Sequence, residues 1–375
     1  MRIDLNIRNL LSAVEENVVQ MENDGAPFNI ELYISRNLPI KFPNKGIIEF
    51  VESSKKIQIH HELFNTTSFL ENHNKNTIES LIDLYGSSHQ RDYCLVISGH
   101  RFNDEQTIEF RGILGINRLY KIILMLRLIG FDQNQLKLLD HKPDYEKIIE
   151  NDINQFPVNT ELVVVGGQVA IGKMLGKEFI LNKFIPGNII SFGEYTYKGK
   201  SIVLTTFPYG DLCEPIVRCL SKKKIKAIVF VGSAGTLTDD IKIGDIVVPN
   251  TIIGTDGRIK TNKFFNRFRE LEGRDVKFSC LHTSVITPLI ETISFVAELK
   301  KIGCETIDVE AGYFQNGCEN WLQDSCKVGL MLYITDRPHA KKSIAEHDYS
   351  DLSVKIVRER MASILKDSLK TFIND

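Results

Sequence analysis

The sequence lacks the features that mark membrane-spanning, disulfide-stabilised and zinc-binding proteins. It contains no run of about 18 apolar residues, so no membrane span is expected. Its seven cysteines form no C-x-x-C pair and are odd in number, which favours reduced thiols in a cytoplasmic protein over a disulfide framework or a zinc site. The N-terminal stretch carries acidic residues every few positions and has no small-residue cleavage site, so we expect no signal peptide.

An excess of charge of either sign is also missing. The 46 Lys and Arg residues nearly balance the 48 Asp and Glu residues, and the formal net charge of −2 gives no reason to expect nucleic acid or a membrane surface as a partner. With 43% hydrophobic and 25% charged residues the composition is that of a globular protein with a sizeable core. A length of 375 residues indicates two domains, or one large domain with an extension.

Residues 1–155 predict an N-terminal α/β or α+β accessory domain of unknown role. Apolar residues from Ile7 to Val18 recur at helical spacing, and Leu119–Ile129 and Tyr145–Phe156 also predict helices. His100 and Arg101 follow a predicted strand and are site candidates, but such residues are more often loop residues satisfied by solvent or backbone. The predicted strands are Phe28–Ile34, Ile47–Val51, Lys56–His60, Cys94–Ser98 and Leu136–Leu139.

From residue 156 to 375 strands and helices alternate, which is typical of an α/β sheet. Lys198-Gly199-Lys200 predicts the turn of a hairpin between Asn188–Tyr197 and Ser201–Thr206. The other predicted strands are Leu162–Val165, Ala227–Val231, Val276–Leu281, Thr306–Val309 and Val328–Ile334, and the predicted helices are Cys213–Lys222, Glu291–Leu299 and Asp351–Phe372.

A run of small residues follows the buried strand Ala227–Val231. We expect Gly232-Ser233-Ala234-Gly235 to form a loop in which a ligand approaches the backbone, before a second strand begins in Ile243–Pro249. A tight structural turn would use the same residues. Gly167–Met174 matches G-x-x-x-x-G-K, but Met174 stands where a P-loop needs Ser or Thr for magnesium, which argues against a P-loop.

Carboxylates stand at the ends of two later strands. Asp308 and Glu310 lie at the junction of a strand and a helix, and Asp336 follows an apolar strand. A carboxylate at the carboxyl end of a strand faces the ligand crevice of an α/β sheet. The alternative is that Asp308 or Asp336 caps the following helix or turn.

Together these segments resemble the purine/uridine phosphorylase superfamily, which includes nucleoside phosphorylases, methylthioadenosine/S-adenosylhomocysteine nucleosidases and AMP nucleosidases. The resemblance covers about residues 160–375. It implies a nucleoside-phosphorylase-like fold, a mixed central sheet flanked by helices, over residues 156–375, together with a homo-oligomer and no metal or organic cofactor. Its parts, in order, are Gly166-Gly167, YKGK, VGSAGTL with IGDIVVP, Thr283–Thr292, DVEA and TDRP.

The resemblance also implies roles for single residues. Glu310 matches the acid that binds the ribose hydroxyls, where a carboxylate stabilises positive charge on the sugar. Asp336 matches the acid that protonates or hydrogen-bonds N7 of a purine, which improves the leaving group. The pocket for the nucleophile and the sugar would be lined by Gly166, Gly232, Ser233 and Val309.

The sequence favours water over phosphate as the nucleophile. Phosphorylases of the superfamily grip phosphate with arginines, but Phe230 stands at one of those positions and the first loop, Gly166–Ala170, has none. That loop carries Gln168 where the hydrolases usually have a water-activating Glu, and Asp211 or Glu214 is a possible substitute.

A basic segment follows Asp336. Arg337–Lys342 would hold the phosphate of a nucleotide or would be a solvated loop.

Taken with the resemblance, the sequence predicts a nucleosidase that releases the free base of a purine nucleoside or nucleotide. Phosphorolysis of a nucleoside and non-catalytic nucleoside binding remain the alternatives.

Overall fold

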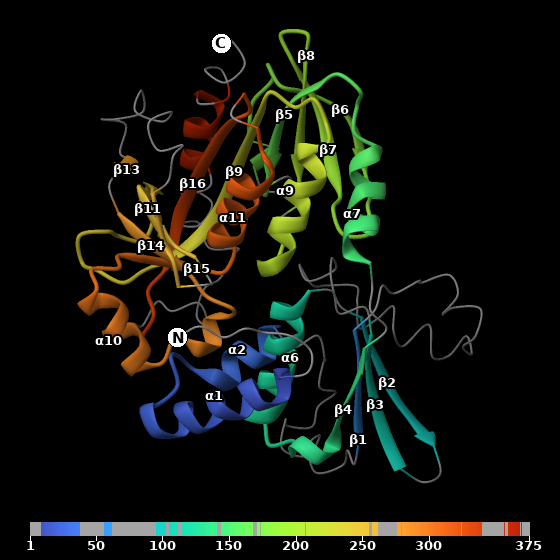
Figure 1. Cartoon of the computed structure of the whole chain (residues 1–375), viewed down its shortest axis with the longest axis vertical. Helices are drawn as coiled ribbons and strands as arrows, with labels where there is room; N and C mark the ends of the chain where they lie inside the picture. Colours follow the sequence, from blue (N-terminus) through green and yellow to red (C-terminus); the bar gives the residue numbers. More distant parts are fainter. Residues whose placement is uncertain are drawn as a thin grey trace. The chain divides into compact units, whose positions relative to one another are not determined.

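A computed structural model describes residues 9–37, 56–61, 95–102, 105–111, 115–140, 144–167, 171–172, 174–206, 208–254, 257–261, 276–278, 280–323, 325–339, 356, 359–367 and 369 (Figure 1). The chain divides into two compact units. We call Leu5–Asp144 the N-terminal unit and Tyr145–Asp375 the C-terminal unit.

The N-terminal unit contains a four-stranded sheet of order β2-β3-β1-β4, in which β1 is parallel to β3 and β4 while β2 is antiparallel to β3. Helix α1 packs on α6, where Arg127 Nη2 donates to Glu15 Oε2 at 2.8 Å. The elements are α1 (Leu10–Asp24), α2 (Ile30–Asn37), β1 (Lys56–His61), β2 (Leu95–Phe102), β3 (Glu105–Arg111), α6 (Ile116–Leu128) and β4 (Leu136–Asp140).

Two predictions for this unit are wrong. The strand expected at Phe28–Ile34 is helix α2, because Asn29 Oδ1 accepts the Leu32 N–H at 2.9 Å and so starts a helix. His100 and Arg101 do not follow a strand but belong to β2, which pairs with the unpredicted β3. The predicted strand Ile47–Val51 lies outside the described residues.

Helix α7 (Tyr145–Asn154) belongs to the C-terminal unit, although the sequence analysis placed it before a boundary at residue 155. It packs against helix α9 (Cys213–Ser221). Its fully buried Asp152 accepts the backbone N–H groups of residues 188, 189 and 190 at 3.0, 2.8 and 3.0 Å. Helix α7 is thereby joined to residues 188–190, which lead into β7 of the large sheet.

The C-terminal unit is mixed α/β, with a 12-stranded mixed sheet flanked by helices, as predicted (Figure 1). The main path runs β12-β11-β14-β15-β9-β5-β8-β7-β6; β16 pairs with β9 and β10, and β10 with β13. The strands are β5 (Thr160–Val165), β6 (Ile180–Ile185), β7 (Phe192–Tyr197), β8 (Lys200–Thr205), β9 (Ala227–Thr236), β10 (Ile246–Val248), β11 (Thr251–Ile253), β12 (Ile259–Thr261), β13 (Val276–Phe278), β14 (Leu281–Ser284), β15 (Thr306–Asp308) and β16 (Lys327–Asp336).

Strand β9 is longer than the sequence analysis predicted. The segment Gly232–Gly235, expected to be a loop, continues the strand to Thr236. Its small residues accommodate neighbours that a side chain would displace, since a Cβ on Gly232 would lie 2.6 Å from the Phe230 ring. The first part of β9 is parallel to β5, the end of β9 is antiparallel to β15, and β16 runs parallel along nearly its whole length.

Helices cover both faces of this sheet. Helix α9 packs on α11 (Ala311–Trp321), and Phe314 of α11 contacts Phe230 of β9 with ring centroids 5.0 Å apart. On the other face, Val229 and Val231 of β9 join a buried cluster with Met361 and Leu365. The latter two lie in the part of the predicted helix Asp351–Phe372 that is described as helical, residues 359–367. Helix α10 (Ile293–Lys301) follows β14.

Candidate active site

The segments that carry the two predicted catalytic acids meet at one glycine of β9. Gly235 pairs with Ile307 of β15 and with Asp336 of β16. A Cβ on Gly235 would lie 3.3 Å from Ile307 Cγ2 and 3.6 Å from Asp336 Oδ2. Both strand ends thus lie against this part of β9, and Glu310 follows β15 by two residues.

Asp336 is the last residue of β16, immediately after an irregularity in its pairing with β9. Its side chain is buried, and its Oδ1 accepts the Thr335 hydroxyl at 2.8 Å. A carboxyl group that is shielded from water and oriented by a neighbouring hydroxyl is suited to exchange a proton with a bound base.

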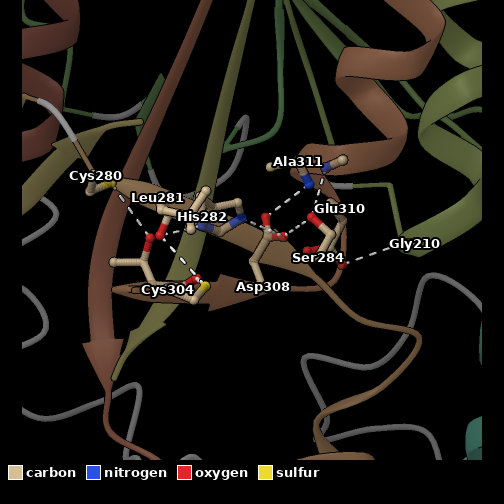
Figure 2. Close-up of polar contacts among 11 residues, drawn as sticks. Gly210, Cys280, Leu281, His282, Ser284, Cys304, Asp308, Glu310 and Ala311 are labelled. Atoms are coloured by element: carbon tan, nitrogen blue, oxygen red, sulfur yellow. Dashed lines mark hydrogen bonds and ion pairs between the residues drawn. The ribbon is translucent and has the colours of Figure 1, made fainter. Parts of the chain in front are cut away.

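Glu310 is also buried, at the N-cap position of helix α11. Its side chain makes no capping hydrogen bond to that helix. Instead its Oε1 accepts the Gly210 N–H at 3.4 Å, from the segment that leads into α9 (Figure 2). The carboxylate thus faces away from the helix that begins at its own position.

The Asp308 side chain, two residues before Glu310, has different partners from the Glu310 side chain. Figure 2 shows the Asp308 carboxylate between His282 on one side and Ser284 and Ala311 on the other. Its Oδ1 lies 2.9 Å from His282 Nε2 and accepts the Ser284 hydroxyl, and its Oδ2 accepts the Ala311 N–H at 2.9 Å. Asp308 therefore caps the helix that follows it, which is the alternative to a site residue that its position in the sequence suggested.

Phe230 and Arg337 make contacts outside this group of acids. Phe230 is fully buried against Phe314. The guanidinium of Arg337 pairs with the exposed Asp239 and donates to the Thr238 carbonyl at 2.7 Å. Arg337 is thus directed to the surface loop after β9, an arrangement that leaves its positive charge partly neutralised.

The remaining predicted site residues lie along the central strands. Gly232 is buried and Ser233 half-buried within β9, and Val309 is buried just before Glu310. Gly166 follows β5, has a φ of 101° and donates its N–H to Thr205 Oγ1 at 3.3 Å. Gln168 and Lys341, from the two loops that the sequence analysis singled out, lie outside the described residues.

The structure reveals one acid that the sequence analysis missed. Glu291 is 5% exposed and follows a short 3-10 helix, Pro288–Ile290. Burial raises the pKa of Glu291 well above its usual value, and the nearby charges of Asp336 and Asp308 raise it further. Within the predicted helix Glu291–Leu299 it resembled an ordinary first-turn acid; only the tertiary fold reveals its burial.

Glu214, a suggested water activator, belongs to helix α9, and its side chain contacts the C-terminal end of helix α11. Its Oε1 accepts from Asn320 Nδ2 at 3.5 Å. Asn320 follows Glu310 by ten residues, which is about 15 Å along a helix. The Glu214 carboxylate is thus turned toward the C-terminal end of α11, whereas the Glu310 carboxylate contacts Gly210. Among the described residues, no three His, Cys, Asp or Glu side chains form a group that could hold a metal ion.

Comparison with known proteins supports the resemblance found in the sequence. Residues 175–288 match the family model of the phosphorylase superfamily. The matched part runs from the segment before β6 to Pro288, just after β14, and includes the whole of β9, whereas Glu310 and Asp336 lie beyond it. No curated protein sequence matches the chain.

Solved structures similar to this chain include both phosphorylases and hydrolases. A methylthioadenosine phosphorylase from an Antarctic soil metagenomic library is 11% identical, over 58% of this chain and 88% of that one, with a TM-score of 0.46. A futalosine hydrolase mutant of Helicobacter pylori is 15% identical, over 56% and 99%, with a TM-score of 0.45. A uridine phosphorylase from Vibrio fischeri is 17% identical, over 60% and 94%, with a TM-score of 0.46.

None of the helices in the described residues has the length and apolar character to cross a bilayer.

Proposed function

We propose that the protein hydrolyses the N-glycosidic bond of a purine nucleoside or nucleotide and releases the free base. One observation carries the proposal: Glu310 and Asp336, both about 95% buried, stand on segments that meet at Gly235 of β9. Buried carboxylates are costly to keep unless they are paired or used. Two of them at neighbouring strand ends fit a reaction that separates a sugar from a base.

The two acids would divide the reaction between them. Glu310 would accept hydrogen bonds from the ribose hydroxyls and stabilise the positive charge that develops on the sugar as the bond breaks. Asp336 would donate a proton or hydrogen bond to N7, so that the base leaves as a neutral molecule. Val309, buried beside Glu310, would supply an apolar wall to the sugar.

Water rather than phosphate is the proposed nucleophile. Phosphate is a dianion that needs paired, charge-bearing donors such as arginine. Phe230 stands where the superfamily's phosphorylases carry an arginine and is packed into the core against Phe314. Arg337 is engaged with Asp239 and the Thr238 carbonyl.

The proposal is tested by following base release from adenosine, inosine, AMP, ATP and methylthioadenosine by chromatography, each with and without phosphate. Equal release in both conditions is the expected result. Release that requires phosphate would replace hydrolysis by phosphorolysis. If none of the substrates is cleaved but adenine or a nucleoside binds, the protein is a nucleoside-binding protein instead.

We further propose that the enzyme is a cytoplasmic homo-oligomer and that the N-terminal unit is an accessory domain. The oligomer rests on the superfamily resemblance, and the cytoplasmic location on the cysteines, six of which are described and free. Light scattering on the purified full chain measures the oligomeric state, and a monomer at assay concentration would contradict the first proposal.

A further inference from the structure

Helix α11 is capped by residues other than its own N-cap residue. A helix begins with N–H groups that have no partner within the helix. At α11 the Ala311 N–H is taken by Asp308 Oδ2 at 2.9 Å, and the Gly312 N–H by Ser284 Oγ at 2.7 Å. Glu310, which occupies the N-cap position, makes no side-chain capping bond. The N-terminus of α11 is therefore capped without the Glu310 carboxylate.

Asp308 is held in place by two buried partners from strand β14. His282 and Ser284 of β14 both contact its Oδ1, and all three residues are at most 5% exposed (Figure 2). On its other side His282 Nδ1 lies 2.9 Å from the hydroxyl of Thr306, so the ring cannot turn without losing a partner. The buried carboxylate receives contacts from His282, Ser284 and Ala311, which compensate for its burial.

We propose that Asp308, held by His282 and Ser284, is a positioning residue that keeps Glu310 from capping helix α11. The positive end of the helix dipole and its N–H groups attract the nearest carboxylate. With Asp308 occupying that place, the Glu310 side chain turns to Gly210 instead. The ribose-binding part of this inference rests on the proposed function, whereas the capping part does not.

The structural test is a crystal structure of the full chain carrying Asp308→Ala. The expected result is a Glu310 carboxylate within hydrogen-bond distance of the Ala311 or Gly312 N–H. A Glu310 side chain that still accepts the Gly210 N–H would overturn the proposal. If Asp308→Ala does not fold, Ser284→Ala removes the partner of the Gly312 N–H together with one hydrogen bond to Asp308, and Glu310 is then expected to turn to the Gly312 N–H.

The kinetic test compares kcat/KM for a purine ribonucleoside with that for its 2′-deoxy counterpart. Asp308→Ala should lower the ratio of the two by about tenfold or more, the effect of losing one charged hydrogen bond. Glu310→Ala should lower it as well, and adding Asp308→Ala to Glu310→Ala should lower it no further, because the first residue acts through the second.

A matched control is Asp152→Asn, which also alters a buried carboxylate that accepts backbone N–H groups, but on helix α7. It should reduce stability and leave the ratio unchanged. A ratio that Asp308→Ala does not change, or that Asp152→Asn changes equally, would contradict the positioning role. If the wild type releases no base, the proposed function fails, and the crystal structure alone decides whether Asp308 controls Glu310.

Discussion

Among single residues, Asp336 has the most demanding role in the proposed reaction, because it must supply a proton or hydrogen bond to the departing base. Asp336→Asn keeps the shape of the side chain but cannot donate a carboxylic proton. We expect turnover of a purine substrate to fall by about 10²-fold or more, the usual effect of losing a general acid. Base release under saturating substrate measures this loss. Unchanged turnover would remove Asp336 from the mechanism.

Glu291 makes the stability of the protein depend on pH. Burial and the charges of Asp336 and Asp308 raise its pKa well above the usual value. Between the ordinary pKa of about 4.3 and the raised value, the folded protein binds more protons than the unfolded chain. Stability contributed by this group is therefore lost as pH rises, with a slope of up to about 1.4 kcal/mol per pH unit.

Replacing Glu291 by Gln removes the titration while keeping the size of the side chain. We expect Glu291→Gln to gain stability relative to the wild type as pH rises from 5 to 8. Urea unfolding of both proteins at each pH measures the difference in the free energy of unfolding. A difference that stays constant across this range would show that folding does not raise the pKa of Glu291.

Residue-scale predictions from the sequence depend on which neighbour a side chain meets. The segment Asp308–Glu310 suggested either capping or catalysis, and the structure assigns capping contacts to Asp308 alone. His282 and Ser284, which hold Asp308, carry no sequence signal, since a polar residue in a short strand has many possible partners. Their role follows from the pairing of β14 with β15.

Among the elements, helix α7 contributes to stability through one carboxylate. Asp152 accepts three consecutive N–H groups, which become unsatisfied or repelled when an amide replaces the carboxylate. We expect Asp152→Asn to reduce the free energy of unfolding by about 2–3 kcal/mol. Urea unfolding measures it.

Glu150→Gln is the control on the same helix. Its carboxylate pairs with Lys222 at the surface, with both side chains more than 40% exposed. Such an exposed pair contributes little to stability, because solvent screens it. Equal losses for Asp152→Asn and Glu150→Gln would show that the buried hydrogen bonds of Asp152 are not what stabilises this region.

Local patterns predicted most described elements of the C-terminal unit, because apolar β-branched runs and helical spacing act over a few residues. The turn at Lys198-Gly199 is confirmed, with φ of 48° and 79° at the two positions. Strand β6 was missed because its residues are largely exposed and it lacks a buried run. The Gly232–Gly235 strand was missed because glycine indicates a loop, and only the neighbouring strands β16 and β15 show why small residues continue a strand here.

For the whole molecule, the position of the boundary between the two units is testable. A fragment of residues 145–375 retains helix α7, while a fragment of residues 156–375 loses it together with its packing on α9 and the Asp152 hydrogen bonds. We expect the longer fragment to have the higher Tm and the greater soluble yield. Equal thermal unfolding of the two fragments would place α7 outside the folding unit.

At this scale the sequence indicated the two-part organisation and the mixed sheet, since alternating strands and helices require a common sheet. It did not indicate the order of the strands. That order depends on pairings such as Gly235 with Ile307 and Asp336, which join segments about 70 and 100 residues apart in the chain. No local pattern contains such information.

The meeting of β15 and β16 at Gly235 also bears on how such a protein can diversify. The end of β16, which carries Asp336, and strand β15, which leads to Glu310, are both held by backbone pairing with β9. Loops can therefore change in length and sequence, and with them the substrate that is admitted, while the two strand ends stay paired with β9. A mutational library confined to loop residues should yield altered substrate preference far more often than loss of the chemical step.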